Sequence, residues 1–597
     1  MSFKLIPEMF LQSVDKYKDK IAYYEKKEGQ WVGLTFKEIG NQVELFSAGL
    51  ASLGVKKDSK VAILSGNCPR WGISDYALAG LGAGSVTVYP TLISPQIKYI
   101  IEDSDAEFII TQNSEQTDKI LTFIQDCPNL RGIITMDDTN DSENRIQGFK
   151  DVQDAGEQYI KSTGFSYAES TRHINPDDLL TLIYTSGTTG NPKGVILTHK
   201  NLCSNIISAH VAMPMVSDDV FLSFLPLSHS FERMTGHFSG FANGGTTYFA
   251  ESVESVAADM LDVSPTITIA VPRLYEKIYA KVLDKVSKDP ALRQKIFWWA
   301  INVGKEASKY LRRSQTVPGI LGLKFKLADK LVYSKLKSRV GGKLRLFISG
   351  GAPLSKEIGE FFMAAGLPII EGYGLTETSP VITCNRLELI KFGTVGKAID
   401  GVEVKIAKDG EILCRGDNVM TGYYNNKAAT SEAIDSEGWF YTGDIGEFDE
   451  DNYLKITDRK KSLLVTAGGK NVAPTPLELA LTGNKFIEQC LVLGDRRKFI
   501  SALIVPAFDI LLEWAQKNDI TIKDKKALVK NKTVLEFYDQ EIEKVMSNFS
   551  HYERVKKVAL LGQEWTIKSG EMTPKLSIKR KVVEKNFAHV IEEIYNV

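Results

Sequence analysis

Glycine, hydroxyl and lysine residues are concentrated between Tyr184 and Gly194 (YTSGTTGNPKG), a composition that could hold an anionic ligand. Its three glycines let the backbone approach a ligand without hindrance from a Cβ atom. Lys193 adds a positive charge, and four hydroxyl side chains can bond anionic oxygens together with nearby N–H groups: Thr185, Ser186, Thr188 and Thr189. Such a loop suits a polyphosphate whose charge is held while one phosphorus is attacked. By composition alone it could also be a polar hairpin turn.

The spacing within this loop excludes a Walker A motif. In G-x-x-x-x-G-K-[ST] the lysine directly follows the second glycine and a hydroxyl residue follows the lysine. Here Asn191 and Pro192 separate Gly190 from Lys193, and Gly194 comes next. The stretch instead resembles the Y-T-S-G-[ST]-T-G-x-P-K-G signature of the AMP-forming adenylate synthetases, which include acyl-CoA synthetases. The resemblance implies that Thr188 contacts Mg²⁺ and assists catalysis, and that the other loop residues bind ATP: Thr185, Ser186, Gly187, Thr189, Gly190 and Lys193.

Two later strand-to-loop corners carry residues that could meet the same ligand. One apolar strand ends at Gly350, Gly351 and Ala352, where the backbone can approach closely. The other is EGYGLTE, residues 371–377, in which Tyr373 can stack on adenine. Alone, a Gly-Tyr-Gly turn before a helix cap is commonplace, but Y-G-L-T-E resembles the family motif whose glutamate binds magnesium. The resemblance implies that the whole corner contacts ATP or its Mg²⁺ ion: Glu371, Gly372, Tyr373, Gly374, Thr376 and Glu377.

Two charged positions match the part of the family pattern that holds ribose. WFYTGD, residues 439–444, resembles [WF]-x-x-T-G-D, whose aspartate accepts hydrogen bonds from the ribose hydroxyls. An ionised Asp444 only accepts, which suits a diol. Arg459 aligns with an arginine that reaches ribose or phosphate, and Lys461 falls at the hinge position of the family. Standing alone, these charges would be interpreted as a solvated β-turn.

His229 lies in FLPLSHSFER, residues 224–233, which places a histidine and an ion pair, Glu232 and Arg233, among apolar neighbours. A single histidine in such surroundings is more often structural than catalytic. The form P-L-[SA]-H-x-F-E-R, however, is that of long-chain acyl-CoA synthetases, in which the matching histidine lies by the acyl-carboxylate pocket. We therefore expect His229 in the wall of a fatty acid pocket, with no role in proton transfer.

The C-terminal segment EMTPKLSIKRK, residues 571–581, departs from the family pattern. The family lysine of this segment contacts the carboxylate and α-phosphate during adenylation, but Ser577 occupies its position here. Lys575 and Lys579 lie two residues to either side, so in an extended strand each would share the face of residue 577. We expect Lys575 to take the catalytic role, with Lys579 as the alternative; both could also merely solvate the start of the last helix. Upstream, Gly468 and Gly469 resemble the turn that lines the pantetheine tunnel of CoA.

The segments between these motifs alternate between strand and helix patterns. Apolar residues recur every three or four positions from 36 to 53, which predicts an amphipathic helix. This alternation is typical of a parallel sheet with helices on its faces, where ligands lie beyond the carboxyl ends of strands. The sequence predicts helices at 71–81 and 95–102 and strands at 61–64, 85–89, 108–111, 133–136 and 179–183.

The length of 597 residues indicates more than one domain. We expect an α/β fold with a large N-terminal adenylation domain of layered βα sheets, residues 1–460, and a small mobile α+β lid domain, residues 461–597. Within the second unit, strands are expected at 491–493 and 502–505 and helices at 534–549 and 578–595.

The charge balance and the cysteines constrain the partners and the compartment. With 73 Lys and Arg against 74 Asp and Glu, the chain does not have the charge of a general nucleic-acid binder. The six cysteines are scattered and show no C-x-x-C spacing, as expected for reduced cysteines of a cytoplasmic protein. Residues 1–8 lack the apolar core of a signal peptide, and no apolar run is long enough to cross a bilayer, so we predict a soluble or peripheral protein.

The segment 276–345 is an exception to this balance, with 18 Lys and Arg against 5 acids and the aromatic cluster Phe297-Trp298-Trp299. One interpretation is a solvated helical face with buried aromatics. The other is a basic surface that contacts the inner face of an anionic membrane. The sequence leaves both open, and it does not predict an oligomeric state.

Together the motifs predict a long-chain fatty acid–CoA ligase that uses ATP, Mg²⁺ and CoA and forms an acyl-AMP intermediate. Two alternatives remain at this point. One is a fatty acyl-AMP ligase that loads a carrier protein. The other is a catalytically silent lipid-binding homologue, which the departure at Ser577 keeps open.

Overall fold

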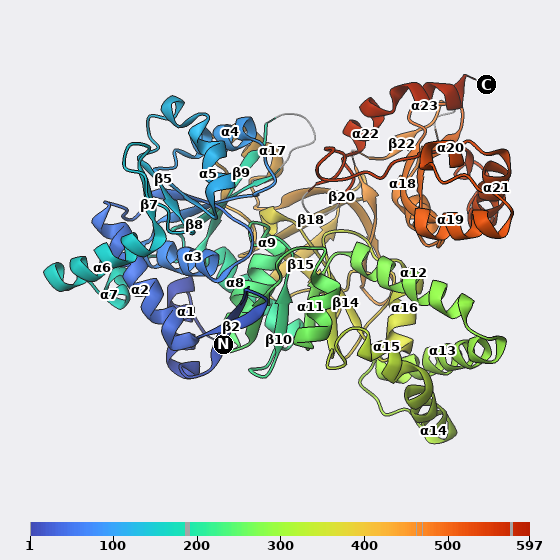
Figure 1. Ribbon diagram of the computed structural model, residues 1–597, viewed down its shortest axis with the longest axis horizontal. Helices are drawn as coiled ribbons and strands as arrows, with labels where there is room; N and C mark the ends of the chain where they lie inside the picture. Colours follow the sequence, from blue (N-terminus) through green and yellow to red (C-terminus); the bar gives the residue numbers. More distant parts are fainter. Residues whose placement is uncertain (1, 186–190, 461, 468–469, 574–576, 597) are drawn as a thin grey trace.

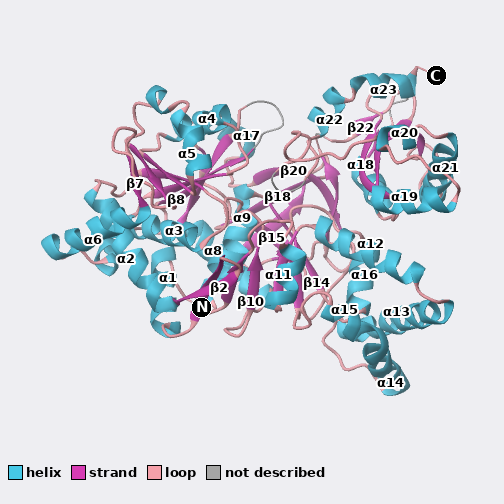
Figure 2. Ribbon diagram, viewed as in Figure 1, coloured by secondary structure: helices cyan, strands magenta, loops and turns pink. Residues whose placement is uncertain are grey.

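The protein has a mixed α/β architecture, shown by a computed structural model that describes residues 2–185, 191–460, 462–467, 470–573 and 577–596 (Figure 1). Among these residues, two sheets of eight and nine strands form the larger N-terminal part, and a four-stranded antiparallel sheet follows them. A smaller unit of helices and strands forms the C-terminal part (Figure 2). The α/β class with a large N-terminal part and a smaller α+β part is therefore confirmed.

The eight-stranded sheet positions the glycine-rich loop. Its centre is parallel, in the order β8-β4-β3-β5-β6-β7. At one edge, β9 pairs antiparallel with β8, and β19 pairs antiparallel with β9. The loop after β8 therefore lies at the carboxyl edge of the parallel strands, as expected. The strands are β3 (Lys60–Leu64), β4 (Gly84–Val88), β5 (Phe108–Thr111), β6 (Gly132–Thr135), β7 (Ile146–Gly148), β8 (Leu179–Thr185), β9 (Lys193–Thr198) and β19 (Gly422–Tyr423).

The helices around this sheet begin and end close to the predicted positions. Helix α2 starts at a capping box in which Thr35 and Glu38 bond each other's backbone N–H groups. Its predicted apolar stripe is fully buried from Phe36 to Leu50. Helix α3 has Pro69 in its first turn and ends at Gly82, whose φ of +67° favours glycine. The helices are α1 (Ile6–Tyr17), α2 (Phe36–Ser52), α3 (Pro69–Leu81), α4 (Ser94–Ser104), α5 (Ser114–Leu121), α6 (Phe149–Thr163) and α8 (His199–Ala212).

The nine-stranded sheet positions the second and third corners. Its parallel centre runs from β11 through β10, β12 and β13 to β14, and β15 returns antiparallel to β14. Strands at this centre are fully buried because helices α12 and α16 pack against them, and α13 packs on α16. The bounds are β10 (Val220–Ser223), β11 (Thr246–Phe249), β12 (Ile267–Ala270), β13 (Leu346–Ser349), β14 (Ile369–Gly374), β15 (Val381–Cys384), α12 (Pro272–Lys288), α13 (Ala291–Leu311), α14 (Gly319–Ala328) and α16 (Lys356–Ala364).

The C-terminal residues bury a hydrophobic core of their own, which includes Leu477, Leu503 and Tyr538. Strand β25 pairs antiparallel with β24 and parallel with β26. The expected strands and the first helix are present, but the single helix predicted at 578–595 is wrong: two helices replace it, because the chain leaves helical geometry at Phe587. The elements are β24 (Ile487–Leu493), β25 (Ile500–Pro506), β26 (Val555–Leu560), α18 (Pro474–Thr482), α19 (Phe508–Lys517), α21 (Lys532–Met546), α22 (Arg580–Asn586) and α23 (Ala588–Tyr595).

The cysteines and the helix lengths agree with the sequence analysis. All six cysteines are free, and five of them are buried. Among the described residues, no helix combines the length and the apolar character needed to cross a membrane.

Candidate active site

The base of the glycine-rich loop is a hairpin between two antiparallel strands. Thr185 at the end of β8 pairs with Lys193 at the start of β9, which confirms the predicted strand, loop and strand. The Tyr184 hydroxyl donates a 2.6 Å hydrogen bond to Asp103. The loop residues between them, Ser186 to Gly190, lie outside the described residues. The hairpin thus fixes both ends of the loop at the sheet edge.

Tyr423 on β19 brings the corner at Glu377 to the base of this loop. Its hydroxyl donates to Glu377 Oε1 at 2.9 Å, and its ring centroid lies 4.9 Å from Lys193 Nζ. The Glu377 carbonyl also accepts a 2.8 Å bond from the Met420 N–H group. Sequence reasoning missed Tyr423, because it belongs to no motif and its contacts come from the pairing of β19 with β9.

Thr376 lies beside the segment that carries His229. The Ser230 and Thr376 hydroxyl oxygens are 3.4 Å apart. The His229 ring accepts a 3.1 Å bond from the Phe231 N–H group and caps a short helical turn. His229 is half-buried, at a point where the predicted pocket segment meets the predicted phosphate corner.

A half-buried asparagine, missed by sequence reasoning, holds this histidine segment in place. Asn67 accepts from the Leu227 N–H group at 2.9 Å and donates to the Leu225 carbonyl at 2.7 Å. It also donates to the Ser223 hydroxyl at 3.0 Å. Asn67 comes from the loop after β3, so its hydrogen bonds join the two large sheets at the segment that precedes His229.

The glycines of the second and third corners are required by close packing. A Cβ atom on Gly374 would lie 1.7 Å from the Pro380 carbonyl oxygen, which no side chain allows. A Cβ on Gly350 would lie 2.9 Å from the Phe231 ring, and Gly351 has a φ of +78°. Gly350 therefore lets its corner meet the histidine segment, and Gly374 lets the end of β14 meet Pro380. Ala352 is exposed beside Gly351, and Gly372 is half-buried on β14.

Glu371 lies beneath the Gly350 corner rather than in the open. Its carboxyl oxygen accepts a 3.3 Å bond from the Leu354 N–H group. Burial raises the pKa of Glu371 to about 8, because the charged form loses its hydration. A neutral carboxyl at this position can act as a hydrogen-bond donor as well as an acceptor.

Tyr373, Asp444 and Arg459 form one group on adjoining strands. The Tyr373 hydroxyl donates to Asp444 Oδ2 at 2.8 Å, and Arg459 Nε lies 3.3 Å from Asp444 Oδ1. Asp444 is on β20 (Phe440–Phe448) and pairs across the sheet with Arg459 on β21 (Leu454–Arg459). The carboxylate is almost fully buried, whereas Arg459 is 63% exposed. The predicted ribose residues are therefore neighbours of the predicted adenine residue.

Comparison with known proteins supports the resemblance to AMP-forming enzymes. Residues 10–424 match the family described as AMP-binding enzyme, and residues 461–597 match the AMP-binding enzyme C-terminal domain. The chain belongs to the AMP-binding enzyme family. This confirms the resemblance on which the sequence prediction rests.

Two relatives of this AMP-binding enzyme carry the name long-chain-fatty-acid–CoA ligase. FadD15 of Mycobacterium bovis is 35% identical over 582 residues, which covers 97% of this chain and 95% of that protein. ACSBG2 of Xenopus laevis is 31% identical and covers 99% of this chain and 83% of that protein. The anthranilate CoA ligase AuaEII, solved in complex with anthranoyl-AMP, shares the fold, with a TM-score of 0.75 at 18% identity over 98% of each chain.

The ion pair of Glu232 and Arg233 that was expected beside His229 does not form in this AMP-binding enzyme. Arg233 instead donates to Asp75 at 2.9 Å and to the Thr181 hydroxyl at 2.7 Å. Glu232 accepts a 2.6 Å bond from the Ser223 hydroxyl, and burial raises its pKa to about 8. Adjacent residues on a helical turn point in different directions, so the pairing suggested by their succession is not the one that the fold uses.

The described residues on either side of Lys575 bond to each other. Met572 and Ile578 pair as an antiparallel bridge, and the Thr573 N–H group donates to the Ser577 carbonyl at 2.8 Å. Lys579 is the residue before α22, and its N–H group donates to the Glu571 carbonyl at 2.7 Å. That the two lysines share a strand face with Ser577 therefore stays a prediction. Lys461, Gly468, Gly469 and Lys575 lie outside the described residues.

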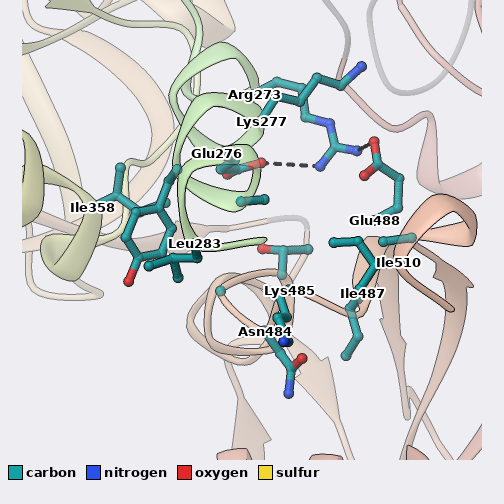
Figure 3. A pocket seen from close by; sticks show the side chains of 15 residues that line it. Arg273, Glu276, Lys277, Leu283, Ile358, Asn484, Lys485, Ile487, Glu488 and Ile510 are labelled. Carbon is teal, nitrogen blue, oxygen red and sulfur yellow. Dashed lines mark hydrogen bonds and ion pairs between the residues drawn. The ribbon is translucent and has the colours of Figure 1, made fainter. Parts of the chain in front are cut away.

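A small cavity separates α12 from the C-terminal unit of this AMP-binding enzyme (Figure 3). Arg273 on α12 forms an ion pair with Glu488 on β24, and its other nitrogen lies 3.3 Å from Glu276. Farther along α12, Lys288 pairs with Glu513 on α19 at 2.6 Å. Two ion pairs thus join the N-terminal and C-terminal parts, away from the group around Asp444.

Proposed function

We propose that this protein is an AMP-forming long-chain fatty acid–CoA ligase. One observation carries the proposal: Tyr373 and Glu377 are four residues apart on one corner. Tyr373 contacts Asp444 of the predicted ribose group, and Glu377 contacts Tyr423, whose ring lies beside Lys193 of the predicted phosphate loop. Four residues span at most about 14 Å, a length that one nucleoside triphosphate can bridge. Adenosine would lie at Tyr373, Asp444 and Arg459, and the phosphates at Lys193, Thr376 and Glu377.

In the first half-reaction, a carboxylate oxygen of the fatty acid attacks the α-phosphorus of ATP. The bond from the α-phosphorus to the bridging oxygen breaks, and pyrophosphate leaves with that electron pair. Lys193 and the loop Thr185–Gly190 would hold the phosphates, while Lys575 offsets the charge at the α-phosphorus. The product is an acyl adenylate, in which AMP is the leaving group that a free carboxylate lacks.

The carboxylate of Glu377 fits a magnesium ion, which it would hold together with Thr188. Magnesium prefers oxygen ligands and is commonly held by one or two carboxylates together with substrate phosphates. Glu377 offers a carboxylate with one oxygen held by Tyr423, and Thr188 would supply a hydroxyl oxygen. When bound, the ion would neutralise charge on the phosphates as pyrophosphate departs.

In the second half-reaction, the sulfur of CoA attacks the acyl carbonyl carbon. The carbon–oxygen bond to AMP breaks, AMP leaves, and the thiol proton passes to solvent or phosphate. Rotation of the C-terminal unit about Lys461 would present Gly468 and Gly469 to the pantetheine arm. The ion pairs of Arg273 and Lys288 would be broken in such a rotation.

His229 would lie in the wall of the fatty acid pocket. It is half-buried, and Ser230 and Phe231 beside it contact the Thr376 and Gly350 corners. The protein would act in the cytoplasm, in contact with the inner face of a membrane where its lipid substrate dissolves.

Pyrophosphate exchange tests the proposal most directly. Purified protein with ATP, magnesium and labelled pyrophosphate should incorporate label into ATP only when a fatty acid is added. With CoA present, a series of acids of increasing length should yield acyl-CoA and AMP in equal amounts. Adenylate without acyl-CoA would indicate a ligase that loads a carrier protein, and no exchange with any acid would indicate a silent lipid-binding protein.

A further inference from the structure

Helix α14 has two apolar faces, of which only one packs against the protein. Leu321, Phe325 and Ala328 pack on the core formed with α13. The opposite side is exposed, although its residues are large and apolar. The exposed residues, with their exposed fractions, are Ile320 (72%), Leu323 (68%), Leu327 (50%) and Leu331 (39%). These four residues are called the α14 outer face below.

The α14 outer face is one continuous stripe. Residues 320, 323 and 327 follow the spacing of three and four that places side chains on one side of α14, and Leu331 follows four residues later in the π-helical segment Asp329–Tyr333. At about 100° per residue, Ile320, Leu323 and Leu327 fall within a sector of about 60°. Exposed apolar residues that are scattered singly need no explanation, but an aligned row of four indicates a contact surface.

Lysines border the α14 outer face on both sides. On the same helical wheel, Lys324 lies on one side of the apolar sector and Lys326 on the other. Residues 319–339 contain six basic residues and one acid, Asp329. Asp329 is already paired with Lys337 at 2.9 Å. Among the described residues, Lys324, Lys326 and Lys330 have no acidic partner within ion-pair distance.

We propose that the α14 outer face docks on a bilayer that contains anionic lipid. The apolar stripe would enter the boundary between headgroups and acyl chains, and the bordering lysines would reach the phosphates with their long stems. Anionic lipid attracts basic residues at its surface, so charge and apolar area act together. A ten-residue helix is too short to span the membrane, so the contact is peripheral.

The charge pattern argues against a second copy of this chain as the occupant. A two-fold contact through the α14 outer face would bring two rows of lysines together. The only acid in 319–339 is already paired, so this repulsion would find no compensation there. An anionic lipid surface supplies the missing charge instead.

The location also suits the proposed ligase, on which this part of the inference rests. Long-chain fatty acids dissolve in bilayers, and α14 packs on α13, which packs on α16 and through it on the sheet that ends in the Gly350 corner. Docking through α14 would hold that sheet close to the lipid. Membrane binding itself can be measured without the ligase reaction, so the two proposals can fail separately.

Vesicle flotation with the full-length protein tests the inference. Two kinds of vesicle are compared, phosphatidylcholine alone and phosphatidylcholine with 30% phosphatidylglycerol, at low and high salt. We expect the protein to float with the anionic vesicles at low salt. The triple variant Ile320→Ser, Leu323→Ser, Leu327→Ser and the charge variant Lys324→Glu, Lys326→Glu should each reduce the partition coefficient at least tenfold.

The matched control is Val216→Ser, Leu261→Ser, Leu535→Ser, which alters three exposed apolar residues elsewhere. It should float like the wild type, and all variants should keep the wild-type Tm and acyl-CoA synthesis from albumin-bound oleate. Absence of flotation by the wild type, or equal flotation of the α14 variants and the control, would overturn the proposal. A wild-type dimer that the α14 variants convert to monomer would also overturn it, since a second copy would then be the occupant.

Discussion

The hydroxyl group of Tyr423 donates a 2.9 Å hydrogen bond to the carboxylate of Glu377. The two residues are 46 positions apart, and the same tyrosine ring lies under the Lys193 ammonium group. Burial and the neighbouring carboxylate raise the pKa of Tyr423, so its hydroxyl remains a donor at physiological pH. One oxygen of Glu377 is therefore held by the protein, and the carboxylate has a fixed direction.

Tyr423→Phe should weaken the use of magnesium. Without the hydroxyl, Glu377 loses the bond that orients it, and the loss of one hydrogen bond to a charged group costs about 1.5–3 kcal/mol at most. We expect the magnesium concentration for half-maximal pyrophosphate exchange to rise about 10- to 100-fold. Tyr424→Phe is the control, because that hydroxyl makes only an exposed 3.3 Å contact with Asp105. Equal effects of the two substitutions would contradict the role given to Tyr423.

Asp444→Asn should raise the KM for ATP. The buried carboxylate accepts bonds from Tyr373 and Arg459, and an amide cannot replace a charged acceptor for the ribose hydroxyls. A charged hydrogen bond is worth about 1.5–3 kcal/mol, so the KM should rise about 10- to 100-fold. Asp451→Asn, at a 69% exposed surface ion pair, is the matched control. Steady-state kinetics at saturating oleate and CoA would detect the difference, and an unchanged KM in the first variant would place ribose elsewhere.

The elements of the first sheet were predictable because their signals are local. The stripe from Phe36 to Leu50 and the alternation of strands and helices follow from apolar spacing alone. The same holds for two of the corners, since Gly350 directly follows the short apolar strand β13 and Gly374 is the last residue of β14. The packing that makes those glycines necessary, against Phe231 and Pro380, could not be predicted from the sequence.

The contacts that assemble the site were not predictable, because they join distant segments. Asp75 and Arg233 are 158 positions apart, whereas the sequence suggested that Arg233 pairs with its neighbour Glu232. Asn67 likewise meets Leu227 only because the two sheets lie together. The hydrogen bond between Thr573 and Ser577 was not predicted for a local reason, since a polar and lysine-rich segment has no apolar period.

Glu232→Gln should make stability less dependent on pH. The pKa of this acid rises from an ordinary 4.5 to about 8 because it is buried. Between these values the folded state keeps a proton that the unfolded state has released, so stability falls as pH rises through this window. Glutamine stays neutral and can still accept the bond from Ser223. The Tm of the variant should therefore decrease less than that of wild type between pH 5.5 and 8.5.

The control for this pH measurement is the exposed acid Glu254. Glu254→Gln should follow the wild-type dependence of Tm on pH. If Glu232→Gln and wild type show the same slope by differential scanning fluorimetry, Glu232 is already ionised in the folded protein.

Glu488→Arg should loosen the C-terminal unit. The substitution places a second positive charge opposite Arg273 and removes the ion pair of Arg273 and Glu488 across the cavity in Figure 3. Partly exposed pairs contribute about 1 kcal/mol or less, so proteolysis at the junction 459–467 should accelerate about 2- to 5-fold. The double variant Arg273→Glu, Glu488→Arg should restore the wild-type rate. Glu403→Arg, opposite Arg415 within one sheet, should leave the rate unchanged; no rescue by the double variant would mean that the pair does not hold the two parts together.

Lys575→Ala should slow adenylation and spare thioester formation. A lysine that enters the first half-reaction offsets charge at the α-phosphorus, and the loss of one such group costs about 100- to 1,000-fold in kcat. In the second half-reaction the adenylate already exists, so thioester formation from synthetic oleoyl-AMP and CoA should stay within about threefold of wild type. Lys579→Ala is the matched comparison. The Lys579 N–H group donates to the Glu571 carbonyl at the start of α22, and alanine keeps this backbone bond. If Lys579→Ala loses pyrophosphate exchange and Lys575→Ala does not, the catalytic lysine is Lys579; if neither variant loses exchange, the charge is offset from outside this segment.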